Sequence, residues 1–195
     1  VCSSDLLDAC AAPGGKTAQL LERADLDLLA LDSDPSRLQR VQQTLDRLRL
    51  PAAGSTVRLQ AADAREVASW WDGRPFDAIL LDAPCTASGI VRRHPDVRWL
   101  RRPADVDALA ATQRQLLDAL CPLLAPGGRL LYATCSLFRA EGQQQTDAFL
   151  QRRAGRQLRL AAASPGHLLG VPDNQASPEA GPAGDGFFYA LMHQP

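Results

Sequence analysis

The sequence has few cysteines, a single lysine and no long apolar run. Its five cysteines are an odd number and none of them forms a CxxC pair, which argues against a disulfide framework and against a zinc knuckle. We therefore expect reduced thiols, no bound metal and a cytoplasmic protein. No apolar run is long and uncharged enough to span a membrane, and the start VCSSDLLD lacks the basic and apolar regions of a signal peptide.

An excess of charge of one sign is also missing. The net charge is −1, from 21 basic and 22 acidic residues, so no global field predicts nucleic-acid binding. Lys16 is the single lysine, and every other basic side chain is arginine. A local basic patch lies in the stretch IVRRHPDVRWLRR, which contains Arg92, Arg93, Arg98, Arg101 and Arg102.

Short apolar runs alternate with amphipathic stretches along the 195 residues. Apolar runs predict strands at 6–9, 26–32, 57–61, 76–82 and 129–135. Apolar residues at helical spacing predict a helix after Asp34 and a longer one from Pro103. This alternation predicts one α/β domain with a mostly parallel, doubly wound sheet and helices on both faces.

The second half of the chain carries weaker signals. We expect the long helix to end at the APGG stretch, 125–128, because glycine is a common helix stop. A helix at about 140–153, a strand near 158–161 and a closing strand at 187–193 follow. The segment 164–186 is rich in proline, glycine and small polar residues, which predicts a loop.

Polar residues recur where the predicted strands end. Ligands bind beyond the carboxyl ends of the strands in sheets of this kind. The residues at such ends are the 10–16 loop, Asp32, Asp63, Asp82 with Cys85, and Thr134 with Cys135. Five strand ends that converge on one edge are difficult to explain by packing, so we expect an active site there.

The first of these ends is the glycine loop, which consists of Cys10, Ala11, Ala12, Pro13, Gly14, Gly15 and Lys16. Glycines let the backbone approach a ligand closely, and the start of the following helix favours an anionic group such as a carboxylate. The loop matches neither GxGxxG nor GxxxxGK[ST], which weakens the dinucleotide and nucleoside-triphosphate interpretations. An ordinary strand-to-helix turn is the alternative.

Two aspartates follow the glycine loop. Asp32 lies about 20 residues beyond it, where an acidic side chain accepts the ribose hydroxyls of a nucleoside. Asp63 suits the exocyclic amine of an adenine, or it begins a helix. Together these groups predict a pocket for an adenosine with an anionic tail, which fits S-adenosylmethionine; NAD is the rival cofactor.

The two thiols Cys85 and Cys135 are expected beside this pocket if the strands that precede them are neighbours. A nucleophilic thiol needs a polar, electropositive setting, because its ordinary pKa is about 8.5. Methylation of cytosine at C5 requires prior nucleophilic addition at C6, and a second thiol suits release of the product. From the residues alone, either thiol is a candidate nucleophile.

The motifs DACAAPGGKT, LDSD, DAPCTASG, HPDVRW and YATCS occur in an order that closely resembles the RNA cytosine-C5 methyltransferases, in particular those acting on bacterial 16S rRNA. The resemblance runs from about Leu7 to the end. It implies a Rossmann-like class I S-adenosylmethionine-dependent methyltransferase fold. It also implies a 16S rRNA substrate and a protein that acts without a metal, as a monomer.

The resemblance also implies residue roles. The glycine loop binds S-adenosylmethionine, with Asp32 on the ribose and Asp63 near the adenine. Asp82 contacts the methyl donor and the target base. Cys135 is the nucleophile, and Cys85 promotes product release. Residues 6–195 correspond to the catalytic domain, 1–5 to a segment foreign to it, and the family's N-terminal RNA-binding domain is absent.

The basic patch predicts contacts with RNA. Arg92, Arg93, Arg98 and His94 are expected on phosphates or the base, and Trp99 is suited to stack on a splayed base. A solvated loop is the alternative. The wider alternatives are the same chemistry on tRNA or another RNA, a catalytically inactive RNA-binding fragment, and a nicotinamide oxidoreductase.

Overall fold

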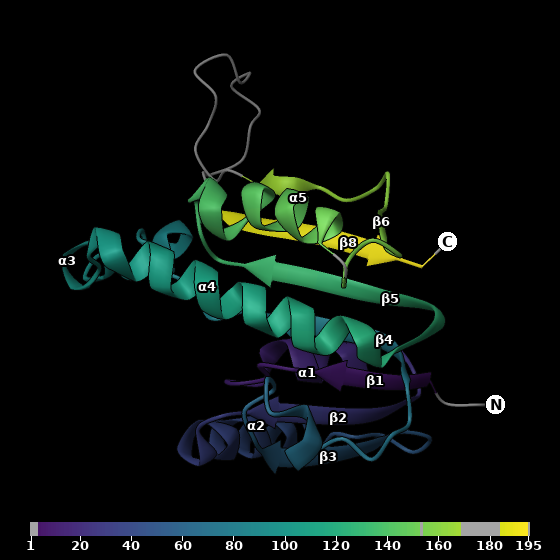
Figure 1. Cartoon of the computed structure of the whole chain (residues 1–195). Helices are drawn as coiled ribbons and strands as arrows, with labels where there is room; N and C mark the ends of the chain where they lie inside the picture. The colour runs from purple at the N-terminus through teal and green to yellow at the C-terminus, as the bar shows by residue number, and fades with distance from the viewer. Residues whose placement is uncertain (1–3, 153, 169–183, 195) are drawn as a thin grey trace, which may run out of the picture.

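The computed structural model describes residues 4–152, 154–168 and 184–194. It contains a sheet with the strand order β3-β2-β1-β4-β5-β8-β6, with β7 paired to β8 (Figure 1). The strands are β1 (Ser4–Asp8), β2 (Leu26–Asp32), β3 (Thr56–Ala61), β4 (Phe76–Asp82), β5 (Leu124–Thr134), β6 (Arg159–Leu160), β7 (Gly166–Leu168) and β8 (Phe187–His193). The α-helices are α1 (Gly15–Leu21), α2 (Pro35–Leu48), α3 (Val97–Leu100), α4 (Pro103–Leu120) and α5 (Gln143–Gln151).

Strands β1 to β5 are parallel, and β8 returns antiparallel to β5. The arrows for β1 and β5 point to the same side of Figure 1, whereas β8 points back. The predicted doubly wound sheet is therefore confirmed. Among the described residues, no helix combines the length and apolar character needed to cross a membrane.

Alternation along the inner strands divides the core between the two faces of the sheet. Leu29 and Leu31 of β2 pack in a cluster with residues of α4 and α5, whereas Leu28 and Ala30 pack with residues of α1 and α2. Side chains point alternately to opposite faces of a strand, so a continuous apolar run is the pattern required when helices cover both faces.

A helix cap explains where α2 begins. Asp34 accepts hydrogen bonds from the backbone of Ser36 and Arg37, at 2.8 and 3.4 Å, and Pro35 occupies the first turn of α2. An aspartate cap followed by proline is a strong start signal. The helix therefore begins directly after the strand end that carries Asp32.

The expected end of the long helix was wrong. Helix α4 ends at Leu120 and is followed by a 3₁₀ turn at Cys121–Leu123, and β5 already begins at Leu124. Pro122 lies in that turn, and proline lacks the N–H that a helix interior requires. The APGG stretch therefore belongs to the first residues of β5 rather than to a helix cap.

The expected loop at 164–186 was also partly wrong. It contains β7, which pairs antiparallel with β8, while 169–183 lies outside the described residues. A three-residue strand leaves too little alternation for its detection from sequence. The expected strand near 158–161 is confirmed as β6, and the expected helix at 140–153 is the shorter α5.

The core assignment predicts different costs for two leucines of α2. Leu45 is fully buried, whereas Leu48 is 38% exposed. We expect Leu45→Ala to lower the free energy of unfolding by about 2–5 kcal/mol through lost burial and a residual cavity. The matched change Leu48→Ala should cost about 1 kcal/mol or less. Urea denaturation measures both, and equal costs would contradict the assignment of Leu45 to the core.

Candidate functional site

The site lies at the carboxyl edge of the sheet, where the strand order reverses between β1 and β4. The loop after β1 turns sharply into α1. Gly14 has a φ of 98°, and a Cβ added there would lie 2.9 Å from the Cα of Val41. The left-handed conformation and the close approach of α2 both require glycine at this position.

Asp32 is locked to the glycine loop. Its Oδ2 accepts a hydrogen bond from the N–H of Ala12 at 3.2 Å, and its Oδ1 accepts from the N–H of Asp34 at 3.1 Å. The side chain is nearly fully buried, and Nη1 of Arg37 lies 3.6 Å from its Oδ1. The carboxylate therefore has a defined position on the wall of the site.

Asp63 is held by a neighbouring cation. Arg65 Nε donates to Oδ1 at 3.0 Å, and Arg65 Nη2 donates to Oδ2 at 2.6 Å. These hydrogen bonds lower the pKa of Asp63. An adenine amine at this position would therefore share the carboxylate with Arg65.

Lys16 links the glycine loop to the end of β4, across the point where the strand order reverses. Its Nζ lies 2.5 Å from Oδ2 of Asp82 at the end of β4. Burial opposes the charge on Lys16, but Asp82 and its hydrogen bond outweigh it and raise the pKa of the amine. The single lysine of the chain is thus a fixed positive charge between the glycine loop and the segment that carries Cys85.

A cavity of about 630 Å³ lies at this edge of the sheet. It brings together most of the residues singled out from the sequence. The predicted members of its wall are Cys10, Ala12, Pro13, Asp32, Asp63, Asp82, Cys85 and Cys135. A second hollow of about 250 Å³ shares Cys10, Ala12, Pro13 and Asp82 with this cavity and is also lined by Ala11, Gly15, Lys16 and Asp8. Gly14 is not among the residues that line either space and acts through the turn.

The two thiols lie side by side on this wall. Strands β4 and β5 are parallel neighbours, as the prediction required, and the Sγ atoms of Cys85 and Cys135 are 3.4 Å apart. The hydrogen bond from Cys85 lowers the pKa of Cys135, and Lys16 acts in the same direction, while burial and Asp82 oppose it. The same contact and burial raise the pKa of Cys85. With Cys85 as the donor of this contact, the hydrogen bond favours the thiolate at Cys135.

Burial raises the pKa of two other ionisable groups near the loop. Desolvation raises the pKa of Asp8 to about 7, although the Thr17 hydroxyl donates to its Oδ2 at 2.7 Å. Its Oδ1 has no hydrogen-bond partner among the described residues. Burial also raises the pKa of Cys10, which makes this thiol a poor nucleophile.

The family model described as "16S rRNA methyltransferase RsmB/F" matches residues 3–193. The chain belongs to this family. It is 55% identical over 188 residues to Ribosomal RNA small subunit methyltransferase B of Xanthomonas campestris, covering 96% of the chain and 42% of that protein. The Vibrio cholerae protein of the same name is 47% identical over 189 residues, covering 96% and 41%. The chain thus spans about two fifths of these relatives.

A solved structure supports the same assignment. The chain is similar to NSun6 from Pyrococcus horikoshii, solved with SFG, with a TM-score of 0.76 and 30% identity over 98% of the chain and 48% of that structure. The methyltransferase homolog protein from the same organism gives a TM-score of 0.75 at 29% identity, over 99% and 62%. The RsmB/F chain therefore has the Rossmann-like methyltransferase fold that the motifs implied.

The basic patch of this RsmB/F chain lies on the same side of the molecule as the carboxyl edge, around α3 (Figure 1). Trp99 is 81% exposed, and Arg98 lies over its ring at 5.8 Å. Arg93 pairs with Asp185 at 2.5 Å, and Arg92 donates to the carbonyl of Gly184 at 3.4 Å. His94 is exposed. The other three arginines also have partners: Arg98 donates to the Pro95 carbonyl at 3.2 Å, Arg101 donates to the Thr86 carbonyl at 2.9 Å, and Arg102 pairs with Asp105 at 3.2 Å. The patch thus combines an exposed aromatic side chain with arginines that already hold contacts within the chain.

Three buried side chains at this site were missed in the sequence. Thr86, Ser136 and Glu141 are buried behind the two thiols. Thr86 and Ser136 directly follow the two cysteines, which was an available signal. Glu141 precedes α5 and has the sequence appearance of an ordinary helix-start acid.

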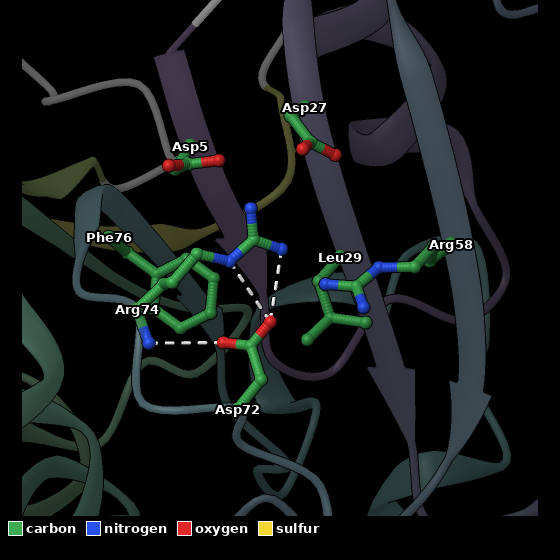
Figure 2. Close-up of a pocket in the computed structure, with 7 residues that line it drawn as sticks. All are labelled: Asp5, Asp27, Leu29, Arg58, Asp72, Arg74 and Phe76. Carbon is green, nitrogen blue, oxygen red and sulfur yellow. Dashed lines mark hydrogen bonds and ion pairs between the residues drawn. The ribbon is translucent and has the colours of Figure 1, made fainter.

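A small hollow of about 10 Å³ lies at the opposite edge of the sheet, at the start of the strands (Figure 2). Asp72 and Arg74 form an ion pair there, with both Nε and Nη2 of the arginine 3.0–3.1 Å from Oδ2. This volume corresponds to about one water molecule. The hollow lies at the wrong edge and is too small for a cofactor.

The hydrogen bond between Cys85 and Cys135 predicts how the reactivity of Cys135 depends on pH. Cys85→Ala removes the S–H donor, so the pKa of Cys135 should rise, and its alkylation at a pH below that value should slow by about tenfold per pKa unit. Iodoacetamide labelling from about pH 6 to pH 10, read by mass spectrometry of the Cys135 peptide, measures the profile.

Cys121→Ala is the control, because this buried thiol donates to the Ala154 carbonyl at 3.0 Å, remote from the site. It should leave the Cys135 profile unchanged. An unaltered profile in Cys85→Ala would show that the hydrogen bond does not govern Cys135.

Proposed function

We propose that the chain is the catalytic part of an S-adenosylmethionine-dependent methyltransferase that modifies C5 of a cytosine in 16S rRNA. One observation carries the proposal most strongly: two thiols lie 3.4 Å apart on the wall of the cavity lined by the glycine loop and Asp32. Membership of the RsmB/F family supports the rRNA substrate.

The residues around the cavity fit S-adenosylmethionine. Asp32 presents a fixed carboxylate suited to the ribose hydroxyls, and Asp63 is suited to the adenine side. The buried Oδ1 of Asp8 has no partner among the described residues and belongs to the wall of the adjacent hollow. An amino-acid tail supplies an ammonium donor for such an acceptor, and the start of α1 suits its carboxylate.

When bound, S-adenosylmethionine supplies an electrophilic methyl group. The thiolate of Cys135 adds to C6 of the cytosine, forming an S–C6 bond and making C5 nucleophilic. After C5 takes the methyl group, a base accepts the C5 proton, the C5–H electron pair re-forms the C5=C6 double bond, and the S–C6 electron pair returns to sulfur. We assign promotion of this release to Cys85, because its S–H stabilises the departing Cys135 thiolate. Asp82, paired with Lys16, is assigned to the methyl donor and the target base.

We further propose a division of labour along the chain. Residues 6–195 form the catalytic domain, although β1 begins at Ser4. Arg92, Arg93, Arg98 and His94 are proposed to hold RNA phosphates, and Trp99 to stack on a base.

Cofactor binding is testable without RNA. Isothermal titration with S-adenosylmethionine should give saturable binding, and Asp32→Asn should weaken it by about ten- to a hundredfold, because the loss of one charge-assisted hydrogen bond costs about 1.5–3 kcal/mol. The conservative change Asp72→Asn, at the far edge of the sheet, should leave it unaltered. Absence of binding by the wild-type chain would favour the inactive RNA-binding alternative.

The thiol roles predict two different defects. Cys135→Ser should lower methyl transfer to 16S rRNA by about a thousandfold or more, because loss of a nucleophile removes the covalent route. Cys85→Ser should accumulate a covalent protein–RNA adduct that survives denaturing electrophoresis. Full activity in Cys135→Ser, with loss of capture in Cys85→Ser, would show that the roles are reversed.

The target is measured by adding the chain to a strain whose own enzyme has been deleted. Bisulfite mapping of its rRNA should reveal one restored 5-methylcytosine, absent when Cys135→Ser is added instead. Restoration on tRNA alone would contradict the 16S rRNA assignment while leaving the chemistry intact.

A further inference from the structure

A buried carboxylate lies behind the two thiols and has no part in the reaction just proposed. Glu141 is at the end of the 3₁₀ turn Arg139–Glu141, and its exposed fraction is 0%. A buried charge is costly unless hydrogen bonds replace its lost hydration. The contacts that offset this cost therefore indicate what the side chain holds in place.

Both oxygens of Glu141 are fully engaged. Oε1 accepts from the N–H of Thr86 at 3.0 Å and from Nε2 of Gln113 at 3.1 Å. Oε2 accepts from the hydroxyls of Thr86 and Ser136, both at 2.6 Å. Four donors thus converge on one carboxylate.

Two of these partners are the neighbours of the two cysteines in the chain. Thr86 directly follows Cys85, and Ser136 directly follows Cys135. Gln113 also fixes the residue that precedes Cys85, because its Nε2 donates to the carbonyl of Pro84 at 2.9 Å. One carboxylate therefore joins the loop after β4 to the loop after β5.

The backbone of Glu141 is fixed from the strand side. The Tyr132 hydroxyl, in β5, lies 2.7 Å from its carbonyl oxygen, and the Thr134 hydroxyl donates to the same oxygen at 3.3 Å. The Glu141 side chain thus reaches the two loops from a backbone that is hydrogen-bonded to β5, the strand that ends just before Cys135. Fully satisfied buried networks of this kind make the local structure rigid.

We propose that Glu141 is a positioning residue that sets the separation and alignment of the Cys85 and Cys135 thiols. This inference rests on the proposed function for its catalytic meaning. Misplacement of reacting groups by about 1 Å costs up to about a hundredfold in rate, so a clamp between the two loops matters to any step that uses both sulfurs.

The chemistry of the partners explains why a carboxylate is needed. The Thr86 N–H and the Gln113 amide are fixed donors, and an ionised carboxylate is a group that only accepts. In Glu141→Gln one oxygen becomes an NH₂ donor. If that donor faces the Thr86 N–H and the Gln113 amide, donor meets donor. If it faces the two hydroxyls, both must turn their hydrogens elsewhere and their charge-assisted hydrogen bonds are lost. A glutamine therefore keeps the shape but loosens the clamp.

The first test measures thiol alignment directly and needs neither RNA nor cofactor. A diazenedicarboxamide oxidant converts the two thiols to a disulfide: the S–S bond forms, and two electrons and two protons pass to the azo group, which becomes a hydrazine. We expect Glu141→Gln in the 195-residue chain to form the Cys85–Cys135 disulfide about tenfold more slowly, well within the cost of misplaced groups. Mass spectrometry of the linked peptides gives the rate.

Each disulfide rate is divided by the alkylation rate of Cys135 in the same variant, which removes any change in thiol ionisation. An unchanged ratio would overturn the proposal. A matched control is Gln145→Leu: Gln145 is buried and donates to the Ala110 carbonyl at 2.6 Å, joining α5 to α4 instead of the cysteine loops. It should lower thermal stability but leave the ratio unaltered. An equal slowing in this control would show general loosening and would also overturn the proposal.

If Glu141→Gln does not fold, Thr86→Val is the second variant, since it preserves the shape and the N–H while removing one 2.6 Å hydrogen bond. It should slow disulfide formation in the same direction. An unaltered ratio in this variant would count against the clamp.

The catalytic arm compares methyl transfer in the same variants. We expect Glu141→Gln to lower kcat by about ten- to a hundredfold, with the affinity for S-adenosylmethionine and the KM for RNA retained. Slower disulfide formation with unchanged kcat would overturn the catalytic part. If the wild-type chain itself transfers no methyl group, the proposed function fails, and the disulfide ratio still decides whether Glu141 positions the thiols.

Discussion

The adjacent, parallel placement of β4 and β5 is the constraint on which the site depends. Asp82 of β4 is paired in register with Ala133 of β5, so the chain leaves both strands at the same edge. Cys85 and Cys135 follow within a few residues, and their sulfurs lie 3.4 Å apart. Were another strand inserted between these two, the thiols would be separated by about 5 Å more and the contact would be lost.

Burial and a shared hydrogen bond give the cysteines at this edge different pKa values. The contact between the thiols lowers the pKa of Cys135 and raises that of Cys85, so one sulfur is prepared to lose a proton and the other to keep it. Cys10 lies close by, but burial raises its pKa. The surroundings of each thiol, its partner or its burial, distinguish these cases, because the side chains are chemically identical.

Much of the fold was predictable because local pattern and tertiary packing agree in the inner strands. The run Leu26–Asp32 supplies apolar side chains to both clusters of the core, as a strand covered on two faces must. The prediction of elements failed where the sequence pattern was short or ambiguous. Glycines 127 and 128 suggested a helix end but lie in β5, and β7 is only three residues long.

The sequence by itself determined which residues collect at the carboxyl edge, because the periodicity of the strands dictates where each polar residue leaves the sheet. It also determined the RsmB/F family, through the order of its motifs. Only the tertiary structure decided that Lys16 meets Asp82 and that Glu141 joins the two cysteine loops. These contacts connect segments whose distance in space no local pattern encodes, since they depend on the strand order and on side chains that meet across it.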